Sequence, residues 1–242
     1  MATRSQYQAK FPLHIAIIMD GNGRLAQARH RPRVFRHQAG VKTVRRIVED
    51  AADLGIKYLT LYSFSTENWS RPKAEIAALF ALLKQYVADD LETLNENNVR
   101  VRILGSRTGL KPDLLELIER VEDRTKNNSE FHLNIAFNYG GRDEILRAFA
   151  KASEAGVDIA GMLETDVTAY LDTSDIPEPD LVIRTSGETR VSNFLLWQAA
   201  YAEFIFTDVL WPDFSKADLE AAIAEFQTRE RRYGNLNASE VA

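Results

Sequence analysis

Short apolar runs alternate with longer stretches of helical periodicity along almost the whole chain, and this alternation constrains the fold most. The runs predict strands at 14–19, 58–64, 99–104, 131–137, 181–184 and 204–206. The stretches between and after them predict helices at 37–54, 73–95, 112–126, 142–152, 192–201 and 215–232. Strands joined by helical crossovers form a mostly parallel sheet covered on both faces. The sequence therefore predicts an α/β fold with one mostly parallel central sheet flanked by helices.

Polar, glycine and arginine residues follow four of the predicted strands. These segments are 20–24, 65–71, 138–142 and 184–190. The carboxyl ends of parallel strands share one edge of the sheet, and ligands bind outside that edge. Turn formation alone does not explain such residues at all four exits, so we expect a ligand site there.

Length and composition exclude several classes of protein. The chain has 242 residues, which suits a single domain over 1–242 with flexible ends expected at 1–12 and 235–242. Its formal net charge of −5 argues against nucleic-acid binding. The absence of cysteine excludes disulfides and cysteine metal sites. No apolar run approaches the ~20 residues of a membrane span, and the N-terminus lacks a signal-peptide core, so we expect a cytoplasmic protein.

The segment 21–23 places glycines on both sides of Asn22, which leaves backbone N–H groups accessible to an anion. Taken alone, the same pattern is typical of a turn. Arg24, Arg33 and His37 lie in a segment without acidic residues and favour a phosphate or diphosphate cradle. Arginine suits that role because its planar fork donates two hydrogen bonds at once.

A second cationic group follows the fifth predicted strand. It consists of Arg184 and Arg190, with the hydroxyl of Ser192 nearby. A single arginine at a strand end is often part of a surface ion pair. Because arginines occur at two strand exits, the pattern favours two anionic substrates or one long polyanion.

Two acidic residues are candidate magnesium ligands. Asp20 ends a buried strand, where it either caps the next helix or binds a metal through its carboxylate. Glu203 lies beside an apolar run and is the second candidate. The stretch 76–83 is apolar on every face of its predicted helix, so it is either buried on both sides or lines an apolar channel.

Several ordered blocks of the sequence resemble the signature blocks of bacterial cis-prenyltransferases, the family of undecaprenyl diphosphate synthase. They are HIAIIMDGNGR, LTLYSFSTENWSRP, LNIAFNYGGRDEI, PDLVIRTSGE, SNFLLWQAAYAEFIFTDVLWPDF and RERRYG, and together they cover nearly the whole chain. The resemblance implies condensation of isopentenyl diphosphate with an allylic diphosphate, farnesyl diphosphate above all, to a cis-polyprenyl diphosphate such as undecaprenyl diphosphate. It also implies Mg²⁺ as cofactor, a homodimer, and an apolar tunnel for the growing chain. Peripheral membrane contact during product release is a further expectation.

The resemblance assigns roles to individual positions. It implies that Asp20 is the essential acid and that Asp20 and Glu203 are magnesium ligands. It also implies that Asn68 assists proton removal. Since an amide is a very weak base, we interpret Asn68 as orienting the substrate. The implied substrate-binding residues are Gly21, Asn22, Gly23, Arg24, Leu25, Arg33, His37, Ser65, Thr66, Glu67, Trp69, Arg71, Arg184, Arg190, Val191 and Ser192.

Three positions depart from the family pattern. Leu25 replaces the usual tryptophan, Arg36 replaces the usual glycine, and Thr189 replaces a histidine that some members have. The first two lie beside the implied allylic site and bear on substrate preference and rate. Two alternatives stay open. One is a short-chain cis-prenyltransferase with the same site but a blocked tunnel, because the sequence does not show the tunnel floor. The other is a non-catalytic partner subunit that binds prenyl diphosphates, which Leu25 and Arg36 favour.

Overall fold

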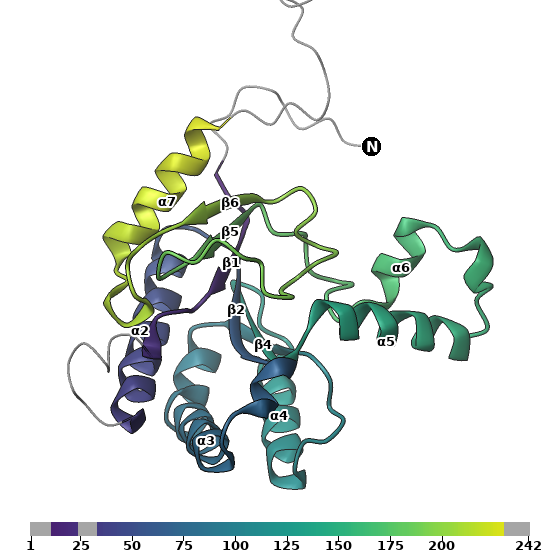
Figure 1. The fold of residues 1–242 in the computed structure, drawn as a ribbon, viewed down its shortest axis with the longest axis horizontal. Helices are drawn as coiled ribbons and strands as arrows, with labels where there is room; N and C mark the ends of the chain where they lie inside the picture. The colour runs from purple at the N-terminus through teal and green to yellow at the C-terminus, as the bar shows by residue number, and fades with distance from the viewer. Residues whose placement is uncertain (1–10, 24–32, 230–242) are drawn as a thin grey trace, which may run out of the picture.

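A six-stranded, wholly parallel sheet runs through the centre of the computed structural model, which describes residues 11–23 and 33–229 (Figure 1). Its strand order is β3-β4-β2-β1-β5-β6. The strands are β1 (His14–Ile18), β2 (Tyr58–Ser65), β3 (Val99–Leu104), β4 (Phe131–Tyr139), β5 (Leu181–Arg184) and β6 (Glu203–Phe206). The helices are α2 (Arg33–Asp53), α3 (Lys73–Glu96), α4 (Pro112–Thr125), α5 (Gly141–Glu154), α6 (Glu164–Tyr170) and α7 (Lys216–Thr228), with 3₁₀ helices η1 (Thr66–Ser70), η2 (Ile159–Gly161) and η3 (Trp211–Asp213). The predicted parallel α/β fold is confirmed.

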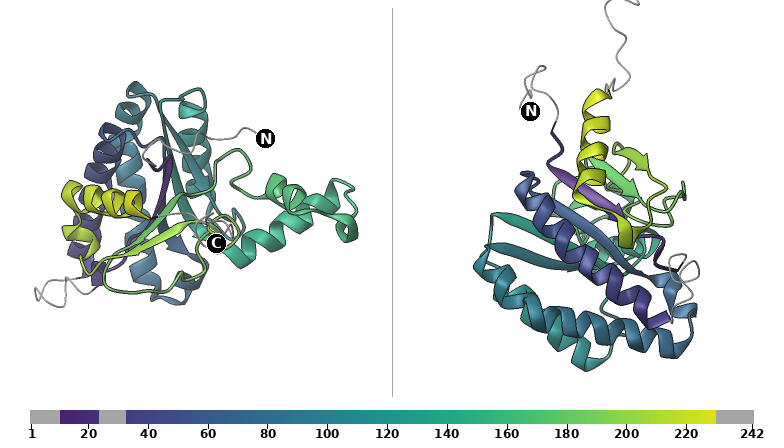
Figure 2. Two further views of the ribbon diagram at one scale, coloured as in Figure 1. Left: turned by 90° about the horizontal axis from the view of Figure 1, so that it is seen from above. Right: turned by 90° about the vertical axis from the view of Figure 1, so that its left-hand side faces the viewer.

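Alternate residues of the strands pack on opposite faces of the sheet. On one face, Ile15 and Ile17 of β1 join a core with the apolar sides of α2, α3, α4 and α7. On the other face, Ala16 and Ile18 pack in a smaller core that includes Phe194. The pair α5 and α6 projects away from the sheet (Figures 1 and 2). Between residues 33 and 229, no helix combines the length and apolarity needed to cross a bilayer.

One predicted helix is wrong. Residues 192–201 form consecutive turns, because Ser192, Asn193 and Leu195 have φ angles of 51°, 62° and 42°. These angles lie in the left-handed region and interrupt an α-helix. Conversely, the sequence did not predict η1 or α6. The short helix η1 is important below because it carries Asn68 to the carboxyl edge of the sheet.

A buried polar row crosses the sheet near the amino end of β1. The carbonyl of Pro177 accepts from His14 Nδ1 at 2.6 Å, since a carbonyl cannot donate. His14 Nε2 therefore accepts from the Thr60 hydroxyl at 2.7 Å, and Thr60 Oγ1 accepts in turn from Asn134 Nδ2 at 3.1 Å. His14 is 1% exposed, and burial lowers the pKa of its imidazole to about 4.

This neutral histidine predicts an acid-sensitive fold. Above pH 6.5, His14 is uncharged in both states; below it, the unfolded chain takes up a proton that the folded protein takes up only near pH 4. The free energy of unfolding should therefore fall by about 3 kcal/mol as the pH falls from 7 to 4. The ion pairs of Asp172 do not contribute to this slope. Burial alone would raise the pKa of Asp172, but hydrogen bonds from Arg147 lower it to about 2, so these pairs are lost only below the pH range in which His14 acts.

Denaturant titrations at pH 7, 5.5 and 4.5 measure this slope. In a His14→Gln variant, the glutamine does not titrate, so the variant should be less stable at pH 7 but lose most of the slope. His132 should account for a smaller part of the pH dependence that remains in the variant, because burial and nearby cations lower its pKa too. An unchanged slope in the variant would show that His14 is not the sensitive group.

Candidate active site

A cleft of about 900 Å³ opens at the carboxyl ends of the central strands. The sheet order places β1 between β2 and β5. The chain builds β2, β3 and β4 on one side of β1 and then crosses over to build β5 and β6 on the other side. Such a reversal is where parallel α/β sheets bind ligands. The lining residues are Ile18, Met19, Asp20, Gly21, Asn22, Gly23, Tyr62, Ser63, Phe64, Ser65, Glu67, Asn68, Arg71, Glu75, Leu79, Arg184, Ser192 and Asn193.

Asp20 follows β1 and is fixed at the floor of this cleft. Its backbone N–H donates to Thr185 Oγ1 at 2.9 Å, and the same hydroxyl donates to the Asp20 carbonyl at 2.7 Å. The carboxylate accepts from Gly21 N at 2.7 Å and is 38% exposed. The side chain therefore has a fixed direction and retains lone pairs for a ligand.

Arg184 links the second predicted anion site to Asp20, the candidate magnesium ligand. Its Nη2 donates to Asp20 Oδ2 at 2.9 Å. Its Nη1 donates to Ser192 Oγ at 2.7 Å and to the carbonyl of Arg190. The Arg184 side chain is only 7% exposed. Buried charges need such partners, and here the partners come from both sides of the cleft.

The segment 21–23 forms the rim beside Asp20. Gly21 has φ +106°, and a Cβ there would lie 2.9 Å from Leu210 Cδ2, so the position requires glycine. Asn22 lines the cleft, and its buried Oδ1 has no hydrogen-bond partner among the described residues. An unpaired buried acceptor marks a position where a bound donor would be stabilising.

The helix η1 forms the opposite wall. Asn68 Oδ1 accepts from Ser65 N at 3.2 Å, which fixes the amide over the end of β2. Trp69 Nε1 donates to Asn138 Oδ1 at 2.7 Å. Burial would raise the pKa of Glu67, but hydrogen bonds, the first of them from Asn193, outweigh it and lower that pKa. Glu67 is therefore an anion at neutral pH.

An apolar cavity of about 150 Å³ adjoins the cleft. Within the apolar stretch 76–83, Leu79, Leu82 and Leu83 line it. The stretch thus lies against an apolar cavity, as one of its two interpretations predicted. The cavity and the cleft share the lining residues Met19, Asn22, Ser63 and Leu79.

The structure does not bring every predicted site residue into the cleft. Arg190 has a 73% exposed side chain that pairs with Glu188 on the surface, and Val191 packs against the smaller core. Thr66 and Trp69 stand on η1 but do not line the cleft. Thr189 is exposed on the same loop as Arg190. Arg24 and Leu25 lie outside the described residues, as do the side chains of Arg33, Arg36 and His37 in α2.

Within one chain, Glu203 does not lie beside Asp20, its predicted partner at the metal. Glu203 pairs with Leu181 at the start of β5, whereas Ile18 of β1 pairs with Arg184 at its end. The length of β5 therefore separates the backbones of Glu203 and Ile18 by about 10 Å along the strand direction, and Asp20 lies beyond Ile18. Glu203 instead accepts from Arg229 at 3.0 Å. Among residues 11–23 and 33–229, no three acidic or histidine side chains gather as a metal site.

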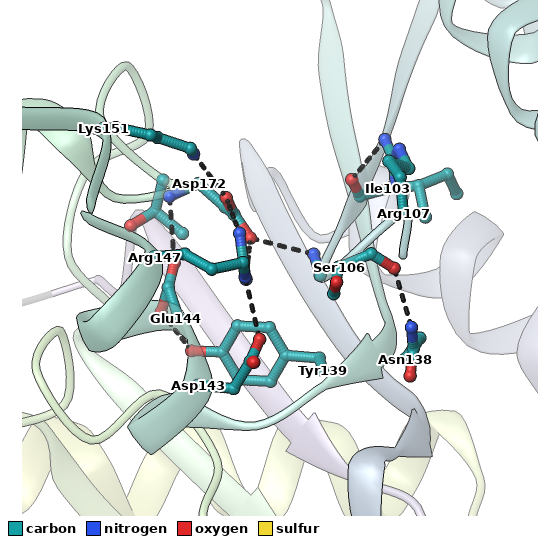
Figure 3. Close-up of polar contacts among 12 residues, drawn as sticks. Ile103, Ser106, Arg107, Asn138, Tyr139, Asp143, Glu144, Arg147, Lys151 and Asp172 are labelled. Carbon is teal, nitrogen blue, oxygen red and sulfur yellow. Dashed lines mark hydrogen bonds and ion pairs between the residues drawn. The ribbon is translucent and has the colours of Figure 1, made fainter. Parts of the chain in front are cut away.

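A polar network that the sequence did not predict joins α5 to the carboxyl ends of β3 and β4 (Figure 3). Arg147 donates to both oxygens of Asp172 at 2.7 Å, and Asp172 also accepts from Gly105 N at 3.0 Å. Asn138 Nδ2 donates to the Ser106 carbonyl at 2.7 Å. Because Asn138 also holds Trp69, the network extends from α5 to η1. The sequence shows only the polar residue Asn138 at the end of β4. It does not show that Asn138 contacts Ser106 and Trp69.

The carboxyl end of β4 continues this network into a buried cluster. Tyr139 donates to Glu144 Oε2 at 2.5 Å, and Gln198 Nε2 donates to the same oxygen at 2.9 Å. Burial raises the pKa of Glu144, despite these hydrogen bonds. The cluster ties α5 to the turns after Ser192.

Comparisons with known proteins agree with this geometry. The family model described as "Putative undecaprenyl diphosphate synthase" matches residues 18–234. An isoprenyl transferase of Caulobacter vibrioides is 55% identical over 95% of this chain and 90% of its own. The crystal structure of lavandulyl diphosphate synthase from Lavandula x intermedia, in complex with dimethylallyl diphosphate, has a TM-score of 0.88 and 34% identity over 93% of this chain and 99% of its own. That of a probable undecaprenyl diphosphate synthase from Campylobacter jejuni has a TM-score of 0.79 and 37% identity over 93% and 100%. The chain therefore belongs to the undecaprenyl diphosphate synthase family and is a prenyltransferase.

Proposed function

We propose that the protein condenses isopentenyl diphosphate with an allylic diphosphate, farnesyl diphosphate in the first instance, to a cis-polyprenyl diphosphate such as undecaprenyl diphosphate. The observation that carries the proposal is the junction of a polar cleft with an apolar cavity through shared lining residues, Met19 and Leu79 among them. Such a site suits a ligand with an anionic head and a hydrocarbon tail.

The side chains of the cleft fit the steps of this reaction. The bond between the allylic carbon and its diphosphate breaks, and the double bond of isopentenyl diphosphate supplies the electrons of the new carbon–carbon bond. N–H groups of 21–23 and the fork of Arg184 would stabilise the anionic groups. The cation left by this attack then loses a proton to a diphosphate oxygen or to Asp20, and the electrons of that C–H bond form the new double bond. Asn68, held by Ser65 N, would orient the substrate because its amide is too weak a base.

Magnesium fits this donor set with Asp20 as its protein ligand. Mg²⁺ is commonly held by one or two carboxylates together with substrate phosphates and water. The Asp20 carboxylate faces the cleft and is partly exposed. When bound, the metal would neutralise diphosphate charge.

Incubation with Mg²⁺, farnesyl diphosphate and labelled isopentenyl diphosphate tests the proposal. We expect labelled, chain-extended prenyl diphosphates whose formation requires both substrates. Binding of both diphosphates without any labelled product would instead identify a non-catalytic prenyl-diphosphate-binding subunit and overturn the proposed activity.

A short-chain cis-prenyl diphosphate synthase is the second candidate, and the size of the apolar cavity favours it. A cavity of about 150 Å³ holds a ligand the size of benzene. A long polyprenyl chain therefore requires α3 to move away from α2, whose Val41 and Val44 line the other side. Chromatography of the same reaction separates the candidates by product length.

We also propose that the protein is a homodimer. Apolar side chains are exposed on the projecting part of the fold and beside β6: Leu146 and Leu163 are 71% and 67% exposed, and Tyr201 is 72% exposed. Burial of these exposed apolar side chains against a second copy of the chain would favour association. Light scattering should give about twice the mass of 27.4 kDa. A monomer at micromolar concentration would contradict this.

A further inference from the structure

The turn after β5 has a strained backbone next to the cleft. Ser192 and Asn193 are consecutive residues in the left-handed region, with φ angles of 51° and 62°. Such conformations cost free energy for residues with a Cβ and persist only where surrounding contacts fix them. Asparagine tolerates this region better than most residues do. The contacts of Asn193 show what fixes it.

Asn193 connects the exits of three strands. Its Nδ2 donates to Glu67 Oε1 at 2.8 Å, on the helix η1 that follows β2. Its Oδ1 accepts from Arg142 N at 3.0 Å, and its carbonyl accepts from Gly141 N at 2.7 Å, both after β4. Asn193 itself follows β5, directly after Ser192, whose hydroxyl accepts from Arg184.

These contacts require the asparagine side chain. The amide supplies a donor for one partner and an acceptor for the other, which neither alanine nor glycine provides. An aspartate would keep the acceptor toward Arg142 but would place a second anion against Glu67. The approach is also close, because a Cβ at Gly140 would lie 2.7 Å from Asn193 Nδ2.

We propose that Asn193 is a positioning residue for the transfer reaction. It holds η1, which carries Asn68, at a fixed spacing from the turn that presents Ser192 and Arg184 to the cleft. The helix η1 and the turn at Ser192 therefore do not have to move into position when both substrates bind. This is the advantage of a preorganised site. This proposal rests on the proposed condensation reaction and adds a residue to it.

A charge substitution tests the contact. Asn193→Asp should lower kcat/KM for isopentenyl diphosphate about 10- to 100-fold at pH 8, as expected for losing a hydrogen bond to a charged group. The loss in kcat/KM should shrink as the pH falls, because protonation of either Glu67 or the introduced aspartate restores a hydrogen-bond donor between them. Asn98→Asp is the matched control: Asn98 is also left-handed, at φ 56°, and its Oδ1 accepts a backbone N–H from Ser129, but it lies far from the cleft.

The same substitution in a Glu67→Gln background completes the test. There, the glutamine amide can donate to the new aspartate, so we expect the cost of Asn193→Asp to be at least tenfold smaller than in the wild-type background. Asn193→Gly, which keeps the left-handed backbone, provides a second variant if the aspartate does not fold, and it should show the same loss without the pH dependence.

Two outcomes would overturn the proposal. One is an equal cost of Asn193→Asp in both backgrounds, and the other is a loss no greater than that of Asn98→Asp. Activity of the wild-type protein separates this failure from failure of the proposed function, because a wild-type protein without product formation refutes the reaction itself.

Discussion

Replacement of Asp20 by asparagine should reduce turnover on the order of 1000-fold, the range found when an electrostatic catalytic group is removed. The substitution keeps the shape of the side chain and one acceptor oxygen but removes the charge. That charge holds Arg184 at 2.9 Å, and in the proposed reaction it also holds the metal. The ion pair between Asp20 and Arg184 and the metal site would therefore be lost together.

The fold should survive this change. The Asp20 side chain is 38% exposed, and its backbone stays bonded to Thr185. Arg184 keeps its bonds to Ser192 and to the carbonyl of Arg190. Asp20→Ala would also remove the acceptor oxygen that asparagine keeps for the nearly buried Arg184, so alanine should lower stability more than asparagine does.

Steady-state kinetics with both substrates, together with thermal unfolding, measure these effects. Asp53→Asn is a matched control, since Asp53 is 71% exposed and only pairs with Lys216 at 3.6 Å on the surface. The control should retain wild-type turnover. Near-normal turnover of Asp20→Asn would show that Asp20 is not central to catalysis.

The parallel sheet and its functional edge could be predicted because both follow from local patterns. The apolar runs at 14–19 and 99–104 have the length and β-rich composition of buried strands, and they match β1 and β3 within one residue. Once the crossovers are helical, the strand exits must share an edge. The segments 20–24 and 65–71 therefore pointed to a common site before any contact was known.

The remaining features depend on contacts that no local pattern contains. The register of β6 against β5 puts Glu203 at the far end of the sheet, and a sequence does not show register. Residues 192–201 have helical composition, but bonds from Gly141 and Arg142 to Asn193 hold the chain in left-handed turns. The Arg190 side chain likewise pairs with Glu188 on the surface, a contact that the sequence does not show.

Gly105 is the second position where one substitution should have a large effect, and here the effect is on folding. It follows β3 and has φ +125°. A Cβ would lie 2.1 Å from the Phe137 carbonyl oxygen and 2.9 Å from that of Asn138. Both oxygens belong to the backbone of β4, an interior strand of the sheet, so they cannot move without disturbing its pairing.

The same turn also connects the network of Figure 3 to the active site. Gly105 N donates to Asp172, and the next residue, Ser106, is bonded to Asn138, which holds Trp69. Displacement of this turn would therefore unpair Asp172 from the sheet and release Trp69. Steric overlap and loss of buried hydrogen bonds add to each other at this position.

Gly105→Ala should lower the free energy of unfolding by more than about 4 kcal/mol, an effect that only core disruption and backbone strain produce. For a protein of this size, the melting temperature should fall by roughly 10 °C or more. Gly109→Ala is the matched control: Gly109 also has positive φ, at +78°, but a Cβ there would have no neighbour among the described residues within 4 Å. It should cost only about 1 kcal/mol, the cost of a left-handed residue. Equal melting temperatures for the two variants would show that φ strain alone, and not the contact with β4, explains the glycine at 105.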